Sequence, residues 1–222
     1  MSSSGIRKGM IPSNEARERD KARVHAIQGR EARAAFARHP SSLKRPEVEG
    51  LVKQFHIPFG CRILLPDSDN HACYPPRGYI AVSTQHLEQG LRFPVPPYLI
   101  EFLNKVKLAP FQLTPNSYTQ LISLAIAFYR IGLHAPTPRI IQEFYSFKAL
   151  SAGEGEKPDG IYYLTARQSQ YKDLLPKGEA KGKSNVGPYK TSWFYISCPS
   201  LADLRNFSFV MKPGIHKKTP TS

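Results

Sequence analysis

The sequence TPNSYTQLISLAIAFYRIG, residues 114–132, predicts the central helix of the fold. Pro115 follows Thr114, and proline suits the first helical position because its missing amide hydrogen would have no partner there. Gly132 is a typical residue to follow a helix end. A helix that is apolar nearly all round is normally buried, so we expect this one to lie in the core. Its apolar residues include Leu121, Ile122, Leu124, Ile126, Phe128 and Tyr129.

The same start signal recurs on either side of this helix. A helix is predicted from Pro96-Pro97, because the residues from Tyr98 to Val106 place their apolar side chains on one face. Another is predicted from Thr137-Pro138, with an apolar face that extends to Tyr145. Two shorter helices are predicted before them. One spans Glu47–Phe55, and one is capped by Ser83 or Thr84 and ended by Gly90.

Short segments rich in β-branched and aromatic residues predict strands. With the helices they indicate an α+β fold, with a mainly helical core and a few short aromatic-rich strands toward the C-terminus. The segments are Cys61–Leu65, Gly78–Val82, Ile161–Leu164, Trp193–Ile196 and Asn206–Met211.

Positive charge is concentrated at the two ends of the chain. The net charge is +14, of which residues 1–46 carry +7, residues 47–211 carry +4 and residues 212–222 carry +3. We therefore divide the chain into a basic arm of 1–46, a globular domain of 47–211 and a basic tail of 212–222. The arm is rich in helix-forming residues but has only a thin apolar stripe, so we expect it to be mobile or conditionally helical.

The basic arm is the strongest functional feature of the sequence. Its Lys and Arg side chains could neutralise phosphates of RNA or DNA, which would give salt-dependent binding without sequence specificity. A solubilising tail is the alternative explanation of the same charges. The candidate nucleic-acid-binding residues are Arg17, Arg19, Lys21, Arg23, Arg30, Arg33 and Arg38.

Catalytic and nucleotide-binding patterns are weak. Asp67, Asp69 and either Glu143 or Asp203 could serve a metal-dependent transposase or nuclease, but the first two lie among turn-forming residues that favour Asp for backbone reasons. The segment Gly178–Ser184 ends like a phosphate-binding loop, yet three residues separate its glycines where four are needed. We expect no enzymatic activity, no catalytic residues, no metal or other cofactor, and no small-molecule substrate.

The three cysteines Cys61, Cys73 and Cys198 are too few and too scattered for a disulfide framework. Cys61 and Cys73, taken together with His56 and His71, match no zinc-finger spacing. The sequence shows neither a signal peptide nor an apolar stretch of the length a membrane span needs. We therefore expect a protein of the nucleus or cytoplasm that has no membrane partner.

Several segments of the globular domain resemble one known family. They include Leu51–Pro58, Gly90–Leu99, Leu113–Ser117 and Gly160–Leu164, and the run Gly-Leu-Arg-Phe-Pro-Val-Pro-Pro at 90–97 is the most specific. Over residues 48–210 the chain is similar to the plant gypsy-type transposon domain, a family also labelled transposase. The resemblance implies a reading frame derived from a plant retrotransposon and does not imply catalysis. Together with the basic arm, it predicts a non-catalytic protein of gag-like role, with weak, sequence-independent nucleic-acid binding and/or self-association. A transposase or nuclease, and a degenerate element copy without present function, are the alternatives.

Overall fold

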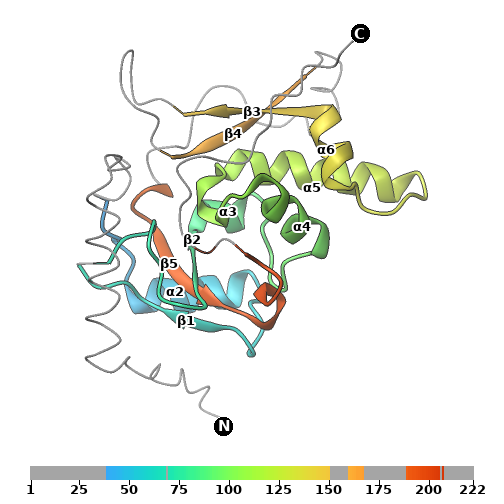
Figure 1. The fold of residues 1–222 in the computed structure, drawn as a ribbon. Coiled ribbons are helices and arrows are strands. Elements are labelled where there is room, and N and C mark those ends of the chain that lie inside the picture. Colours follow the sequence, from blue (N-terminus) through green and yellow to red (C-terminus); the bar gives the residue numbers. More distant parts are fainter. Residues whose placement is uncertain (1–38, 69, 151–159, 168–188, 206, 208–222) are drawn as a thin grey trace.

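The structure is a computed structural model that describes residues 39–68, 70–150, 160–167, 189–205 and 207. The described residues contain five α-helices and two small antiparallel sheets (Figure 1). This arrangement confirms the expected α+β class. Residues 1–38 of the basic arm and the whole basic tail of 212–222 lie outside the described residues.

The first sheet has three strands and takes its central strand from the C-terminal part of the chain. β5 (Trp193–Ser197) lies between β1 (Arg62–Leu64) and β2 (Ile80–Ser83), antiparallel to both. Ile196 of β5 has a partner in each neighbouring strand, and the first four residues of β5 are buried. All three strands lie within or overlap segments predicted from β-forming residues. Their order in the sheet joins parts of the chain that are far apart in sequence.

The second sheet is a two-stranded ribbon of β3 (Tyr145–Ala149) and β4 (Tyr162–Ala166). The sequence predicts β4 but not β3, because the apolar helical pattern after Thr137 continues as far as Tyr145. The helix instead ends at Phe144, and the next residue begins β3. The ribbon packs onto the helices through Phe147, whose ring stacks on that of Phe102 at 5.5 Å.

Four of these five helices begin where proline takes one of the first two helical positions. They are α2 (Arg45–Gln54), α4 (Pro97–Val106), α5 (Pro115–Arg130) and α6 (Pro138–Phe144). The fifth, α3 (Thr84–Glu88), is capped by Ser83, whose side chain accepts a hydrogen bond from the backbone N–H of His86. All five correspond to helices predicted from sequence, and each begins within two residues of its predicted start.

Residues 39–42 lie against the body, although the sequence assigns them to the arm. The backbone N–H of Ser42 donates to the carbonyl oxygen of Thr191 at 2.7 Å, and the indole N–H of Trp193 donates to the carbonyl oxygen of His39 at 3.2 Å. The Ser41 hydroxyl also donates to the carbonyl oxygen of Trp193. The packed part of the chain therefore begins before residue 47.

The segment from Gly90 to Pro97 connects α3 to α4 and is held by the body on several sides. Leu91, Phe93 and Val95 are buried, and the Phe93–Pro94 peptide bond is cis. Arg92 lies over the ring of Phe55 at 4.9 Å and donates a hydrogen bond to the carbonyl oxygen of Leu91. The most specific part of the family resemblance is thus a packed structural connection.

Candidate interaction surface

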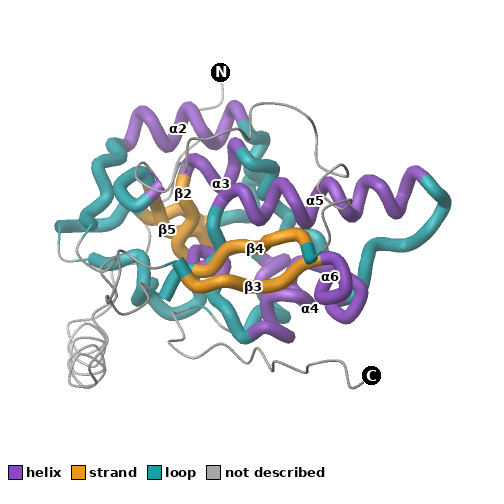
Figure 2. The backbone as a smooth tube through the Cα atoms, turned by 90° about the horizontal axis from the view of Figure 1, so that it is seen from above, coloured by secondary structure: helices purple, strands orange, loops and turns teal. Residues whose placement is uncertain are grey.

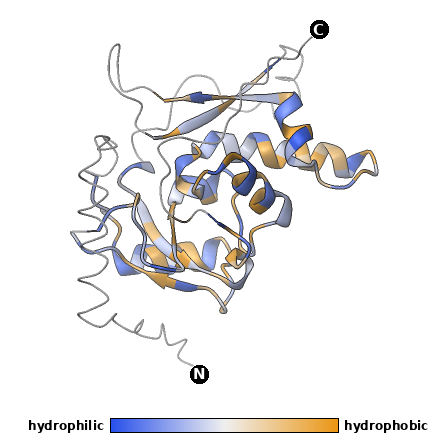
Figure 3. Ribbon diagram, viewed as in Figure 1, coloured by the Kyte–Doolittle hydropathy of each residue, from blue (hydrophilic) through white to orange (hydrophobic). Residues whose placement is uncertain are grey.

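Large apolar side chains are exposed together at the C-terminal end of α5. The exposed fraction is 46% for Ile126, 58% for Tyr129, 71% for Ile131 and 51% for Leu133. Figures 1 and 2 show this end of α5 and the turn after it projecting beyond the neighbouring elements, and Figure 3 shows hydrophobic residues continuing to that end. Scattered exposed hydrophobic residues are ordinary, but four within eight positions are a candidate binding surface.

The expectation that this helix is buried throughout is therefore wrong for its last turns. Tyr118, Leu121, Leu124 and Ala125 are buried, as expected. Ile126 and Tyr129 are expected in the same core because they are apolar, yet both are exposed. Sequence can show that both faces of α5 are apolar, but it cannot show how far the covering elements extend along each face.

One face of α5 carries side chains with the spacing of a helix–helix contact. Thr119, Ile122, Ile126 and Tyr129 are separated by three, four and three residues. Such spacing places side chains in a single stripe along a helix, as in the a and d positions of a coiled coil. We call these four residues the α5 seam.

The end of α3 covers the first half of the α5 seam. The Thr119 hydroxyl donates to Oε1 of Gln89 at 2.6 Å. Gly90 approaches Ile122 so closely that a Cβ atom at this glycine would lie 2.8 Å from Ile122 Cδ1. Beyond Ile122 the seam becomes exposed at Ile126 and Tyr129. The exposed surface therefore continues, along α5, a stripe whose first half is covered by the turn that follows α3.

The projecting end of α5 is fixed by contacts on its other side and by its own termination. The rings of Phe128 and Phe144 meet edge to face, with centroids 6.2 Å apart, which ties α5 to α6. Gly132 has φ +77°, its N–H donates to Tyr129 O at 3.1 Å, and the N–H of Leu133 donates to Phe128 O at 2.9 Å. These two bonds are those of a Schellman motif, which explains why the helix ends at this glycine.

The chain segment that carries the exposed surface has basic side chains. Between Glu101 and Glu143 the sequence contains no Asp or Glu. Arg130 directly follows Tyr129 and is exposed, and so are His134 and Arg139. The α5 end is thus an apolar surface with positive groups and no carboxylate in its own segment of the chain.

A Ser–His pair lies in the core, and its geometry resembles that of a nucleophile and its base. Ser83 Oγ lies 2.8 Å from His86 Nδ1, and the backbone N–H of Ser83 also donates to Nδ1 at 3.1 Å. Since Nδ1 accepts that bond, the ring proton is on Nε2, which donates to the carbonyl oxygen of Leu113 at 2.9 Å. Both side chains are buried, at 0% and 1% exposure.

Burial gives this pair a structural role. A catalytic serine and histidine must reach substrate, and neither side chain meets solvent here. Burial lowers the pKa of His86 from 6.5 to about 4, and the bond to Leu113 opposes this shift. The rings of Phe111, Tyr118 and Tyr189 surround the imidazole at centroid distances of 5.4, 5.2 and 5.6 Å. The neutral imidazole joins α3 to the segment that precedes α5.

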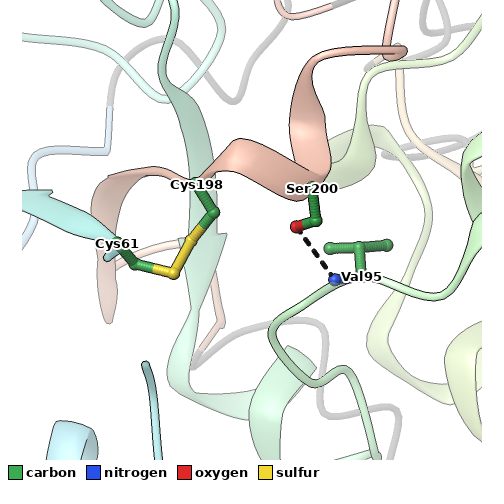
Figure 4. Close-up of a disulfide and its surroundings, with 4 residues drawn as sticks. All are labelled: Cys61, Val95, Cys198 and Ser200. Carbon is green, nitrogen blue, oxygen red and sulfur yellow. Dashed lines mark hydrogen bonds between the residues drawn. A yellow bond between two sulfur atoms is a disulfide. The ribbon is translucent and has the colours of Figure 1, made fainter. Parts of the chain in front are cut away.

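Two of the three cysteines form a disulfide bond that the sequence does not indicate. Cys61 and Cys198 flank the paired strands β1 and β5, and their Cα atoms are 4.3 Å apart (Figure 4). Beside this bond the Ser200 hydroxyl accepts a hydrogen bond from the backbone N–H of Val95 at 3.1 Å (Figure 4). Cys73 is a free, buried thiol whose pKa is raised by burial.

In the part of the chain that the structure describes, the candidate metal ligands do not form a group. Asp67 follows β1, Glu143 lies on α6 and Asp203 follows the short 3-10 helix Pro199–Leu201, while Asp69 is outside the described residues. Among the residues described, no three His, Cys, Asp or Glu side chains form a group that could hold a metal ion. Cys61, which lies near two histidines in the sequence, is bonded to Cys198.

The predicted nucleic-acid-binding residues and the Gly178–Ser184 segment lie outside the residues that the structure describes. Their roles therefore stay predictions. Within the described ranges, we find no helix with the length and apolar character needed to cross a lipid bilayer. The candidate nucleic-acid-binding residues that the structure does not describe are Arg17, Arg19, Lys21, Arg23, Arg30, Arg33 and Arg38.

Comparison with known proteins yields one partial similarity. No protein-family model and no solved structure matches the chain. Over 151 residues, or 68% of its length, the chain is 30% identical to the meiosis-specific protein ASY2 of Arabidopsis thaliana. The matched region spans 10% of that protein, so the chain corresponds to only a small part of it.

Proposed function

We propose that this chain is a non-catalytic, gag-like protein derived from a plant retrotransposon, which binds RNA or DNA without sequence specificity and associates with itself. The observation that carries this proposal is the division of charge, with +7 on residues 1–46 and +4 on the much longer segment 47–211. A basic arm attached to a nearly neutral body suits a protein that binds polyanions through the arm. The similarity to a plant protein is compatible with this origin.

The described residues also carry a surface that suits a binding role. The exposed apolar end of α5 is a surface suited to protein contacts. Together these features favour a scaffold with separate nucleic-acid and protein contacts.

Nucleic-acid binding is tested by removing the arm without disturbing the body. The deletion should end at residue 38, because residues 39–42 hydrogen-bond to the start of β5 and its neighbours. A second variant should replace the seven Lys and Arg candidates from Arg17 to Arg38 with Gln. Both variants should lose most of their affinity for a short DNA duplex and for single-stranded RNA in fluorescence anisotropy at low salt.

The salt dependence gives a quantitative check. If all seven side chains contact phosphates of duplex DNA, the logarithm of the binding constant should fall with the logarithm of salt concentration with a slope of about −6. The Gln variant should show a slope near zero. Unchanged affinity and slope in both variants would contradict nucleic-acid binding by the arm.

Self-association is tested separately by light scattering during size-exclusion chromatography, with and without RNA. A gag-like protein should form dimers or larger species whose population rises with protein concentration. A chain that remains monomeric at all accessible concentrations would exclude self-association. The anisotropy measurements would still decide whether the arm binds nucleic acid.

A further inference from the structure

We propose that the exposed half of the α5 seam is a docking site for an amphipathic helix of another protein, with an apolar stripe flanked by Asp or Glu. This goes beyond the proposed function, because binding of nucleic acid by the arm does not involve α5. The docking surface consists of Ile126 and Tyr129 on the seam, with Arg130 on its flank. Leu133 follows the helix end and is also exposed.

The spacing of the seam indicates a helical partner. Ile126 and Tyr129 continue, at intervals of four and three residues, the stripe that begins at Thr119 and Ile122. The residues at the end of α3 already pack on the first half of that stripe, through Gln89 on Thr119 and Gly90 on Ile122. A partner helix could cover the remaining half by laying its own apolar stripe along the exposed side chains of α5.

The charge around the seam indicates an acidic partner. Arg130 occupies the position next to Tyr129 that corresponds to e of a coiled-coil heptad, where opposite charges on two helices pair. His134 and Arg139 are also exposed in this segment, and it contains no carboxylate of its own. A helix with carboxylates beside its apolar stripe complements this surface, whereas a basic helix would be repelled.

A second copy of this chain does not supply the required carboxylate at its own seam. In a parallel pair, Arg130 would face Ala125 or Gly132 of the second copy, which occupy the g-type positions. In an antiparallel pair it would face e-type positions, which hold Ser123 and Arg130. We therefore assign the surface to a different protein.

The test uses the full chain and a displayed library of helical peptides. Each peptide carries Leu at the seam spacing, and the positions that flank the Leu stripe are randomised among Asp, Glu, Lys, Arg, Ser and Gln. Selection on the wild-type chain should enrich Asp and Glu at those flanking positions. The best peptide is then synthesised, and its affinity is measured by fluorescence anisotropy at physiological salt.

Matched variants distinguish binding at the seam from non-specific hydrophobic or electrostatic binding. Tyr129→Ser should weaken peptide binding about tenfold or more, because an aromatic side chain that becomes buried at the centre of an interface contributes much of the binding free energy. Arg130→Glu should weaken it about tenfold and favour peptides with Lys or Arg instead. Phe59→Ser is the control for hydrophobicity, because Phe59 lies between α2 and β1, outside α5 and the turn after it, and at 91% is more exposed than Tyr129. Lys53→Glu, on the exposed surface of α2, is the control for charge.

Several outcomes would overturn the proposal. They are selection without enrichment of acidic residues, an equal loss of binding in Phe59→Ser and Tyr129→Ser, and an equal loss in Lys53→Glu and Arg130→Glu. Self-association that is abolished by Tyr129→Ser would show that a second copy covers the surface. Binding of phosphatidylserine vesicles that is lost in Tyr129→Ser, without peptide binding, would assign the surface to a membrane instead.

Failure of the peptide-binding test can be distinguished from failure of the nucleic-acid-binding test of the proposed function. The seam variants leave residues 1–46 intact, so their affinity for RNA and DNA should equal that of the wild-type chain. Loss of peptide binding with normal RNA binding supports the seam, and normal peptide binding in the arm deletion shows that the two contacts are independent.

Discussion

His86 Nε2 donates a hydrogen bond to the carbonyl oxygen of Leu113 at 2.9 Å, across 27 positions of sequence. This bond holds α3 against the segment from which α5 begins. The opposite nitrogen, Nδ1, accepts from the backbone N–H of Ser83 and is therefore unprotonated. Protonation of Nδ1 would bring a donor against the Ser83 N–H inside an apolar pocket, so the bond from Ser83 depends on a neutral ring, whereas Nε2 can donate to Leu113 in either protonation state.

His86 should make the stability of the fold depend on pH between about 6.5 and 4. Its pKa falls from 6.5 in the unfolded chain to about 4 in the folded one because of burial. Over that window the unfolded state binds the additional proton, so the free energy of unfolding rises with pH. The contribution is complete above pH 6.5 and about 3 kcal/mol is lost as pH falls to 4.

Urea unfolding at pH 7, 5.5 and 4 measures this effect. His86→Gln keeps a donor toward Leu113 but does not titrate. The slope of its unfolding free energy against pH should therefore be smaller than that of the wild-type chain, by the amount that corresponds to about one bound proton. His134→Gln, at an exposed histidine after α5, is the matched control. Identical pH profiles for the wild-type chain and His86→Gln would show that the buried imidazole does not control stability.

Reduction of the Cys61–Cys198 bond should destabilise the fold by about 2–5 kcal/mol. The bond joins residues 137 positions apart, and cross-links that close long loops restrict the unfolded chain most in the chain-entropy model. The bond also ties β1, an edge strand of three residues, to the central strand β5.

The measurement is the urea midpoint with and without dithiothreitol. The reductant should lower the midpoint of the wild-type chain and of Cys73→Ala, and it should leave the double variant Cys61→Ser, Cys198→Ser unchanged. A wild-type midpoint that does not respond to dithiothreitol would contradict a stabilising disulfide.

Gly90→Ala should destabilise the fold by about 1–3 kcal/mol for two separable reasons. Gly90 has φ +101°, which L side chains rarely adopt, and the new methyl group would lie 2.8 Å from Ile122 Cδ1. Ile122→Val removes that methyl group, so the double variant should recover the steric part of the loss and keep the backbone part.

Gly50 provides the contrasting control. It lies within α2, and the position that a Cβ atom would take there has no neighbouring atom within 4 Å. Gly50→Ala should therefore stabilise the helix by about 0.5–1 kcal/mol. Thermal unfolding should move in opposite directions for the two glycine substitutions. A neutral effect of Gly90→Ala would show that α3 and α5 are not packed as closely as the structure has them.

Gln112→Leu should cost about 2–4 kcal/mol although leucine has a similar size. The buried side chain of Gln112 accepts from the backbone N–H of Ala109 at 3.1 Å and donates to the carbonyl oxygen of Gly160 at 2.8 Å. Leucine leaves both backbone groups buried without these partners. Gln54→Leu, at an exposed position of α2, should change the unfolding free energy by less than about 0.5 kcal/mol. Equal effects of the two substitutions would contradict the proposed bridge.

Much of the secondary structure could be predicted because its signals are local. Pro97, Pro115 and Pro138 mark helix starts through the missing amide hydrogen, and Gly132 marks an end through its positive φ. Aromatic and β-branched residues likewise indicate β4 and β5. The strand β3 is missed because its first residue, Tyr145, also fits the helical pattern that precedes it.

The candidate site could be predicted only in part. The apolar side chains of Ile126 and Tyr129 are visible in the sequence, but their pattern indicates burial. Their exposure depends on where α3 ends in space, and Gly90 and Ile122 mark that place. The basic arm is likewise evident from sequence, and its function stays a prediction.

By itself the sequence of this protein determined where the described helices begin, four of the five described strands, and how charge is divided between the arm and the body. These features depend on neighbouring residues, through backbone sterics, capping and side-chain periodicity. Only the tertiary structure decided that β5 lies between β1 and β2, that Cys61 meets Cys198, and that the α5 seam is covered at Ile122 and exposed at Tyr129. The reason is physical: burial and pairing are set by elements far away in the chain, which local patterns do not position.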